Sequence, residues 1–331
     1  MRNVRNWVSF LLLILAGCGS GYEPVWQWPL ESRSYAEPIV DGKTVYIVSQ
    51  AGEVIAGSYE TGKKAWIKKV NGAILASPAI SARAVFAATQ NGNVYALDKK
   101  TGNQIWTKPF SDRFIAPVSL AGDLILVPSE TGVLYGISQR DGVTRWTLAG
   151  YQKFNTRALV HRSFLLLGGW SNDFLCLGFD GSIKWGFKAA YPISGDAVVD
   201  QNTVYFPAYD GFVYALEIPS GRMRWHSPVK LPTNVIIQNR QLIVGSGNQL
   251  LVLSAQSGQL IRRVLVKKPI ARLYASGNDC LIVSGDVYRI DPISGRIEVL
   301  IRSSKPIFKI AITPKILIAS DELFSISGFR K

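Results

Sequence analysis

The chain has 331 residues, of which 47% are hydrophobic and only 18% carry a charge, so there is enough apolar material for a large core and intrinsic disorder is excluded. Its formal net charge of +14 bears on partners rather than on fold, and suits an anionic membrane surface, an acidic protein or a polyanion. Three scattered cysteines are too few for a disulfide framework.

The first residues are typical of a bacterial export signal. Arg2 and Arg5 precede an apolar run, residues 7–16, that is too short to span a bilayer. The run ends in Leu-Ala-Gly before Cys18, which resembles the lipobox of bacterial lipoproteins. That resemblance implies cleavage before Cys18 and lipidation of its thiol, and Gly19 in place of Asp favours the outer membrane. An ordinary signal peptide with an incidental cysteine is the alternative.

We therefore expect a signal peptide over residues 1–17 and a lipidated tether over residues 18–24. Export makes cytosolic roles, nucleic-acid binding among them, poor explanations of the basic charge.

The rest of the chain, residues 25–331, repeats itself about every 40 residues. Each copy has four short runs rich in Val, Ile, Tyr and Phe, joined by turn dipeptides. Four strands per copy is the plan of a propeller blade. Tryptophans recur at Trp28, Trp66, Trp106, Trp146, Trp185 and Trp225, and turn glycines at Gly62, Gly102, Gly142, Gly181, Gly221, Gly258 and Gly295. The pattern predicts a single all-β domain, a β-propeller of four-stranded antiparallel blades.

Counting the copies gives eight blades. Repeat openings begin near Glu37, Ser77, Ala116, Thr156, Gly195, Thr233, Ala271 and Phe308. The last copy lacks a fourth strand after residues 323–327, whereas an orphan strand, residues 25–30, precedes the first copy. We predict that the orphan strand completes the last blade, because ring closure protects strand edges.

Residues of the repeat have separable structural roles. The turn glycines supply positive φ angles, and a polar residue four positions earlier, such as Asp98, can bind the turn's N–H groups. Each tryptophan is expected to fill the gap between neighbouring blades, with an N–H that needs a partner. In the sixth copy Arg263 sits near the missing tryptophan. A ligand-stacking platform is the alternative interpretation of the tryptophan row.

The copy from Ala96 to Trp106, Ala-x-Asp-x-x-Thr-Gly-x-x-x-Trp, resembles the repeat of the pyrroloquinoline-quinone (PQQ) enzyme family. A lipobox followed by eight such repeats resembles the BamB family of outer-membrane assembly lipoproteins. This resemblance implies a non-catalytic periplasmic scaffold that docks on the barrel-inserting subunit BamA and helps to hand over unfolded outer-membrane proteins.

The same resemblance indicates a partner-binding loop. The family carries Leu-x-Leu-Arg ahead of a central blade, where this chain has Tyr151, Gln152, Lys153 and Phe154, and Lys153 keeps the charge. An acidic loop of the family is replaced by residues 191–194. Alternatives to the assembly role are a PQQ- or small-ligand-binding propeller using the central channel, and an envelope- or peptidoglycan-associated binding lipoprotein.

We expect no enzyme, cofactor or metal site. The two histidines, His161 and His226, lack metal-ligand spacing to a cysteine or carboxylate. Cys176 is expected to be a buried core thiol, with a bond to Cys280 as the alternative. Basic doublets such as Lys99-Lys100 are interpreted as solvated corners. In the alternative, several of them form a positive rim with Arg145 and Arg224 that faces an acidic partner or anionic lipid.

Overall fold

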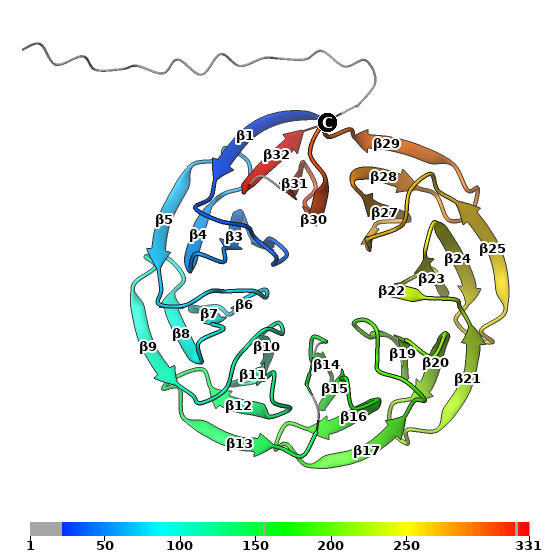
Figure 1. The fold of residues 1–331 in the computed structure, drawn as a ribbon, viewed down its shortest axis with the longest axis horizontal. Coiled ribbons are helices and arrows are strands. Elements are labelled where there is room, and N and C mark those ends of the chain that lie inside the picture. Colours follow the sequence, from blue (N-terminus) through cyan, green and yellow to red (C-terminus); the bar gives the residue numbers. More distant parts are fainter. Residues whose placement is uncertain (1–21, 152, 155, 322–323, 331) are drawn as a thin grey trace, which may run out of the picture.

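The computed structural model describes residues 22–151, 153–154, 156–321 and 324–330. These residues form 32 β-strands in eight four-stranded antiparallel sheets, arranged as blades around a central axis (Figure 1). The predicted eight-bladed all-β propeller is thereby confirmed. Cys18 and Gln152 lie outside the described residues. Within the described part, no helix is long and apolar enough to cross a membrane.

The strands follow chain order within each blade, from the innermost to the outermost. Blade 1 comprises β2 (Ile39–Asp41), β3 (Thr44–Val48), β4 (Glu53–Ser58) and β5 (Lys64–Lys69). Blade 2 comprises β6 (Ala79–Ile80), β7 (Ala84–Ala88), β8 (Asn93–Asp98) and β9 (Gln104–Pro109). Blade 3 comprises β10 (Ser119–Ala121), β11 (Leu124–Pro128), β12 (Leu134–Ser138) and β13 (Thr144–Leu148). Blade 4 comprises β14 (Leu159–His161), β15 (Phe164–Gly168), β16 (Asp173–Gly178) and β17 (Ile183–Lys188).

The second half of the ring has the same plan until the last blade. Blade 5 comprises β18 (Val198–Asp200), β19 (Thr203–Ala208), β20 (Phe212–Glu217) and β21 (Met223–Pro228). Blade 6 comprises β22 (Pro232–Gln238), β23 (Gln241–Ser246), β24 (Gln249–Ser254) and β25 (Leu260–Leu265). Blade 7 comprises β26 (Arg272–Ser276), β27 (Asp279–Ser284), β28 (Asp286–Ile290) and β29 (Ile297–Ile301). Blade 8 comprises β30 (Ile307–Ile312), β31 (Ile316–Asp321), β32 (Ser325–Arg330) and β1 (Glu23–Pro29).

The core is distributed between the blades. Eight hydrophobic clusters each combine side chains of two neighbouring blades, so every middle strand is covered on both of its faces. Between blades 4 and 5, for example, the rings of Phe174 and Phe206 stack with centroids 4.0 Å apart. Outer strands have one exposed face, and in β17 Trp185 and Phe187 point inward while Lys184 and Lys188 are exposed.

The ring closes at the predicted seam, where the two ends of the described chain meet. β1 pairs antiparallel with β32, with Trp28 opposite Ile326, and Figure 1 shows the C-terminus beside the start of β1. Of the predicted strand, residues 323–327, residue 323 lies outside the described residues, and β32 runs from Ser325 to Arg330. Phe324, directly before this strand, adopts a φ of 59°.

Each repeat tryptophan binds the next blade through its indole. Trp66 in β5 donates its Nε1–H to the carbonyl oxygen of Lys99, 3.1 Å away in the turn between β8 and β9. Its ring also lies against Gly102 of that turn, which has a φ of +73°. The same bond, 2.5–3.1 Å long, recurs from Trp106, Trp146, Trp185 and Trp225 to the following blades. The row therefore joins neighbouring blades.

In the first copy this position belongs to Trp26 and not to Trp28. The Nε1–H of Trp26 donates to the carbonyl oxygen of Tyr59 at 2.7 Å, and the Trp26 ring covers Gly62. Trp28 is instead the more deeply buried ring of the seam, and it donates to the carbonyl oxygen of Gly62 at 2.6 Å. In blade 6 it is Arg262, not Arg263, that reaches the next turn, through the carbonyl oxygen of Ser294.

The polar residues before the turn glycines bind the turns as expected. Asp98 accepts hydrogen bonds from the backbone N–H groups of Lys100 and Thr101 at 3.0 and 2.9 Å, and from the Thr101 hydroxyl. These bonds, those of the Thr101 hydroxyl foremost, hold the pKa of the Asp98 carboxyl below its ordinary value. Blade 4 has the shorter turn that its sequence predicts, with the N–H of Gly181 bound to the carbonyl oxygen of Gly178.

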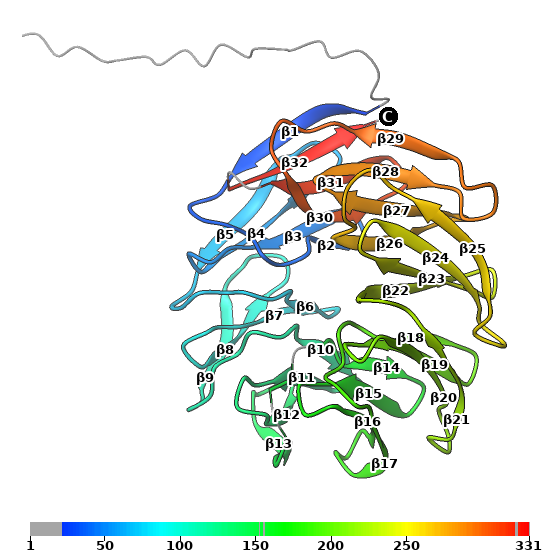
Figure 2. The ribbon, with the colours of Figure 1, turned by 45° about the vertical axis from the view of Figure 1, so that its right-hand side comes forward.

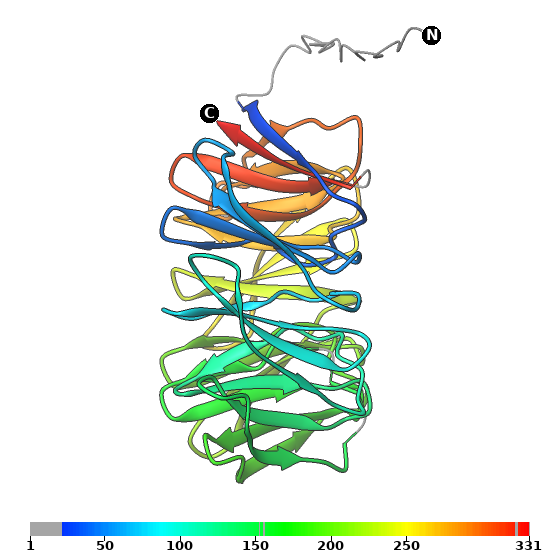
Figure 3. The same cartoon turned by 90° about the vertical axis from the view of Figure 1, so that its left-hand side faces the viewer.

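The antiparallel order divides the ring into two faces, seen edge-on in Figure 3. We call one the turn face, since it carries the turns from first to second strand and from third to fourth strand of each blade. The other, the loop face, carries the turns from second to third strand and the loops between blades. The innermost strand of each blade lies next to the axis (Figure 2). These strands are β2, β6, β10, β14, β18, β22, β26 and β30.

Candidate functional site

Three exposed aromatic side chains mark the loop face of blades 4 and 5. Trp170 and Tyr209 belong to the second turns of these blades, and their rings lie 5.9 Å apart. The backbone N–H of Tyr209 donates to the carbonyl oxygen of Pro192 at 2.9 Å, which brings the turn beside Tyr191. The three side chains are 43%, 48% and 61% exposed for Trp170, Tyr209 and Tyr191. We call Trp170, Tyr191 and Tyr209 the aromatic patch.

The predicted partner-binding loop borders this patch. The backbone N–H of Trp170 donates to the carbonyl oxygen of Lys153 at 2.9 Å. The Lys153 ammonium lies 3.5 Å from a carboxylate oxygen of Glu130. Phe154 is buried, pairs with Gly169 and packs 6.0 Å from the ring of Tyr151. Phe154 therefore packs beneath the loop as a buried residue, whereas Tyr151 and Lys153 are half-buried at the loop surface.

The stretch that replaces the family's acidic loop contributes a single exposed side chain. Ile193 is fully buried, and the hydroxyl of Ser194 donates to the carbonyl oxygen of Pro232 at 3.0 Å. Tyr191 alone projects into solvent. Sequence reasoning missed Trp170 and Tyr209 as surface residues, although a large aromatic residue in a turn of a polar repeat is itself a signal of exposure.

Basic doublets do not gather into one rim. Lys99 and Lys100 lie on the turn face, whereas Lys267 and Lys268 lie in a loop on the opposite face. Several doublet cations have carboxylate partners, including Lys99 with Asp41 and Lys268 with Asp286. The doublets are therefore divided between the two faces, because successive turns of a blade point to opposite faces, and a positive rim on either face would include only some of them.

A ring of eight equivalent positions lines the centre of the propeller. Each lies four residues before the turn that ends the first strand of its blade. The positions are Glu37, Ser77, Pro117, Arg157, Asp196, Asn234, Arg272 and Lys309. Five of these eight positions carry a charged side chain, namely Glu37, Arg157, Asp196, Arg272 and Lys309.

Four of these side chains form an ion-pair network across the channel. The Arg272 guanidinium contacts Glu37 and lies 3.2 Å from Asp196, and Arg157 lies 3.8 Å from Glu37. Tyr274 donates its hydroxyl to Glu37 at 3.3 Å. Burial and the Glu37 charge raise the pKa of Tyr274, which stays protonated at neutral pH. The network connects blades 1, 4, 5 and 7.

Residues considered for catalysis or metal binding do not converge. His161 ends β14 in blade 4, whereas the ring of His226 packs 5.0 Å from Phe212 in blade 5. Cys176 and Cys280 are free and fully buried in blades 4 and 7, and burial raises the pKa of each thiol to about 12. In the described part of the chain, no three His, Cys, Asp or Glu residues are placed to hold a metal ion.

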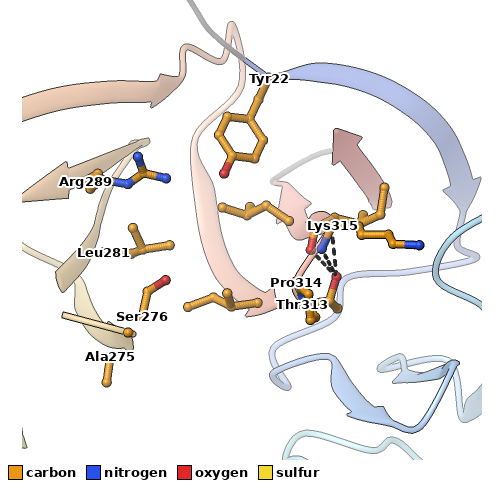
Figure 4. Close-up of a pocket in the computed structure, with 12 residues that line it drawn as sticks. Tyr22, Ala275, Ser276, Leu281, Arg289, Thr313, Pro314 and Lys315 are labelled. Carbon is orange, nitrogen blue, oxygen red and sulfur yellow. Dashed lines mark hydrogen bonds between the residues drawn. The ribbon is translucent and has the colours of Figure 1, made fainter. Parts of the chain in front are cut away.

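A cavity of about 540 Å³ lies between blades 7 and 8 on the turn face (Figure 4). Tyr22 forms one wall, and Arg289 and Lys315 supply its cations. Arg289 lies 3.5 Å from Asp279 and 3.3 Å from Glu298, and Lys315 lies 3.5 Å from Glu60. Both cations of this cavity therefore already have carboxylate partners.

Solved structures with this fold serve different functions. BamB from Moraxella catarrhalis superposes with a TM-score of 0.82 at 17% identity, covering 94% of this chain and all (100%) of that one. A computationally designed protein, Ika8, gives 0.80 at 13% identity, with 92% and 98% covered. A europium-containing methanol dehydrogenase gives 0.80 at 11% identity, with 93% and 86% covered. At such identities these likenesses show the fold alone.

Sequence comparison is more specific. No curated protein matches the chain. The family model described as outer membrane protein assembly factor BamB matches residues 19–68, 50–167 and 152–297, which together span most of the sequence. The predicted family is confirmed: the chain belongs to the family of outer membrane protein assembly factor BamB.

Proposed function

We propose that this protein is a non-catalytic scaffold subunit of the outer-membrane β-barrel assembly machine. It is anchored by a lipid on Cys18 and faces the periplasm. Family membership supports the assembly role, and the lipobox supports the anchor. The single observation that carries the docking role is the aromatic patch at the border of loop 151–154.

The patch has the composition of a binding hot spot. Tryptophan and tyrosine supply large contact areas at a low cost in side-chain entropy, and they are enriched in interface centres. Trp170 and Tyr209 are already held by ring contact and by backbone hydrogen bonds to residues 153 and 192, so little ordering is needed on binding. We propose that a BamA-like subunit docks here, and that unfolded outer-membrane proteins are the clients of the assembled machine.

The position of the patch suits a tethered scaffold. The chain enters the ring at β1 in blade 8, and blades 4 and 5 lie on the opposite side of the ring (Figure 1). A lipid attached a few residues before β1 would hold blade 8 next to the membrane. The patch would then point toward periplasmic domains of the partner.

Affinity purification from gently solubilised membranes tests this proposal. A tagged chain should recover the barrel-inserting subunit, and Trp170→Ala/Tyr209→Ala should reduce recovery strongly, since hot-spot aromatics contribute about 2 kcal/mol each, roughly a thirtyfold change in affinity. Leu260→Ala/Leu265→Ala, on the exposed outer strand β25 of blade 6, is the matched control. Equal recovery with the patch variant and the control would refute docking through the patch.

A further inference from the structure

The charged residues at the centre of the propeller include one cation, Lys309, for which the described residues supply no carboxylate partner. Among the ring positions described above, the two carboxylates of Glu37 and Asp196 are bound by Arg157 and Arg272. Lys309, on β30, is the fifth charged position. In the described part of the chain, no carboxylate lies within ion-pair distance of its ammonium group. The cluster of three cations and two carboxylates therefore keeps one positive charge.

This charge is held in a costly environment. Burial and the nearby Arg272 guanidinium lower the pKa of Lys309, against an opposing effect of Glu37 and Asp196. A half-buried cation without a paired anion is unfavourable for the isolated chain, because the group loses hydration and gains no partner. An anion delivered from outside would remove that penalty.

Lys309 faces a pocket of about 260 Å³ on the loop face. Its lining also includes the aromatic rings of Tyr35 and Phe308, the cations Arg33 and Arg272, and the carboxylate of Asp321. The aromatic rings are 49% and 44% exposed, which is unusual for side chains that line a concave site. The Asp321 carboxylate accepts hydrogen bonds from the hydroxyl and backbone N–H of Ser325, at 2.6 and 3.2 Å.

We propose that this pocket, which we call the Lys309 pocket, binds a carboxylate carried on a single aromatic ring, with the carboxylate against Lys309 and the ring between Tyr35 and Phe308. The size fits such a group, since the volume equals that of about nine waters at roughly 30 Å³ each. The single uncompensated charge favours a monoanion over a phosphate dianion. Two sources have this chemistry: a free aromatic acid, and the carboxyl terminus of a peptide that ends in an aromatic residue.

Calorimetric titration of the purified chain, without any partner subunit, tests the proposal. 3-Phenylpropionate should bind, whereas its neutral amide and the dianion phenylphosphate should bind at least about tenfold more weakly, as expected when a charge-assisted hydrogen bond is lost. Acetyl-Gly-Gly-Phe, as the free acid and as the amide, distinguishes the two sources. Tighter binding of the peptide acid than of 3-phenylpropionate assigns the site to chain termini, and the reverse order assigns it to free acids.

Variants locate the binding. Lys309→Gln should weaken 3-phenylpropionate binding about tenfold, and Phe308→Ala, which removes an exposed ring and leaves the core intact, should weaken it independently. Arg302→Gln makes the same charge change on the loop face outside the Lys309 pocket, and should leave the affinity unchanged. Absence of binding of either acid at millimolar concentration, or equal effects of Lys309→Gln and Arg302→Gln, would overturn the proposal. Neither result would bear on the docking role, which is tested separately by recovery of the barrel-inserting subunit.

Discussion

The contact between a tryptophan of one blade and a turn glycine of the next predicts an unequal cost for two formally identical substitutions. Gly102 and Gly277 both have positive φ angles, +73° and +58°. A Cβ atom on Gly102 would lie 2.6 Å from the ring of Trp66, whereas one on Gly277 would meet nothing within 4 Å. Gly102→Ala and Gly277→Ala therefore share the backbone strain and differ in the clash between blades.

The magnitudes follow from these two terms. A left-handed alanine costs about 1–2 kcal/mol, of which about 0.4–1 kcal/mol is offset because alanine also restricts the unfolded chain. Gly277→Ala should thus lower the free energy of unfolding by about 1 kcal/mol. Gly102→Ala should add an overpacking cost of about 1–3 kcal/mol, because Trp66 is held by its bond to Lys99 and by the ring of Tyr46.

Equilibrium urea unfolding, followed by tryptophan fluorescence, measures both variants. The expected result is a lower midpoint for Gly102→Ala than for Gly277→Ala at an unchanged slope. Introducing Trp66→Leu should shrink the extra cost of Gly102→Ala, since the two residues interact directly. Equal destabilisation by the two alanines would refute the idea that the tryptophan–turn contact joins the blades.

Three further predictions concern the seam, the thiols and the turns. Deleting residues 23–29 removes the outer strand of blade 8 and exposes the edge of β32, so size-exclusion chromatography should show aggregation and thermal unfolding should broaden; a truncated chain as stable as the full chain would contradict the seam. In a Cys18→Ser variant, Cys176 and Cys280 should resist Ellman's reagent until urea unfolds the protein, because both thiols are buried with a pKa of about 12; fast reaction of the native protein would show that a blade opens. Hydrogen bonds from Thr101 and Lys100 hold the pKa of Asp98 below the usual 3.8. The ionised Asp98 therefore stabilises the folded state fully above pH 3.8, and this stabilisation is lost as the pH falls through the lower pKa of the folded state. Asp98→Ala should accordingly lower the urea midpoint at pH 7 and have little effect near pH 2, and an equal loss at both pH values would argue against the assignment.

Much of the fold was predictable because the repeated residues make the same contacts in each blade where they occur. The Thr-Gly turn, the polar residue before it and the tryptophan after it each perform a local task, and the same contacts recur around the ring. The seam was predictable for the same reason. The last copy of the repeat lacked its fourth strand, and the N-terminal strand belonged to no other copy.

The first tryptophan shows where pattern reasoning fails. Trp26 and Trp28 lie two positions apart on one strand and so point to the same side, and both fit an interior position. The spacing of 40 residues between Trp26 and Trp66 favoured Trp26, and only the bonds to residues 59 and 62 separate the two roles.

The candidate sites were harder to predict, because they arise where the repeats differ from one another. The aromatic patch comes from turns of two blades, and turn sequences vary freely when they bear no packing load. The channel network joins Glu37 with residues 157 and 272, far apart in the chain. Aligning one position across all eight repeats would have found it, which local motif searches do not do.

Site-specific photo-crosslinking in living cells tests the docking role most directly. A photoreactive amino acid placed at Tyr191 or Tyr209 of the aromatic patch should capture the barrel-inserting subunit. The same amino acid at Ile293, which is as exposed as Tyr191 (60% against 61%) but lies in a turn-face loop of blade 7, should not. Capture from position 293 and none from positions 191 and 209 would contradict the account of how this propeller engages its partner.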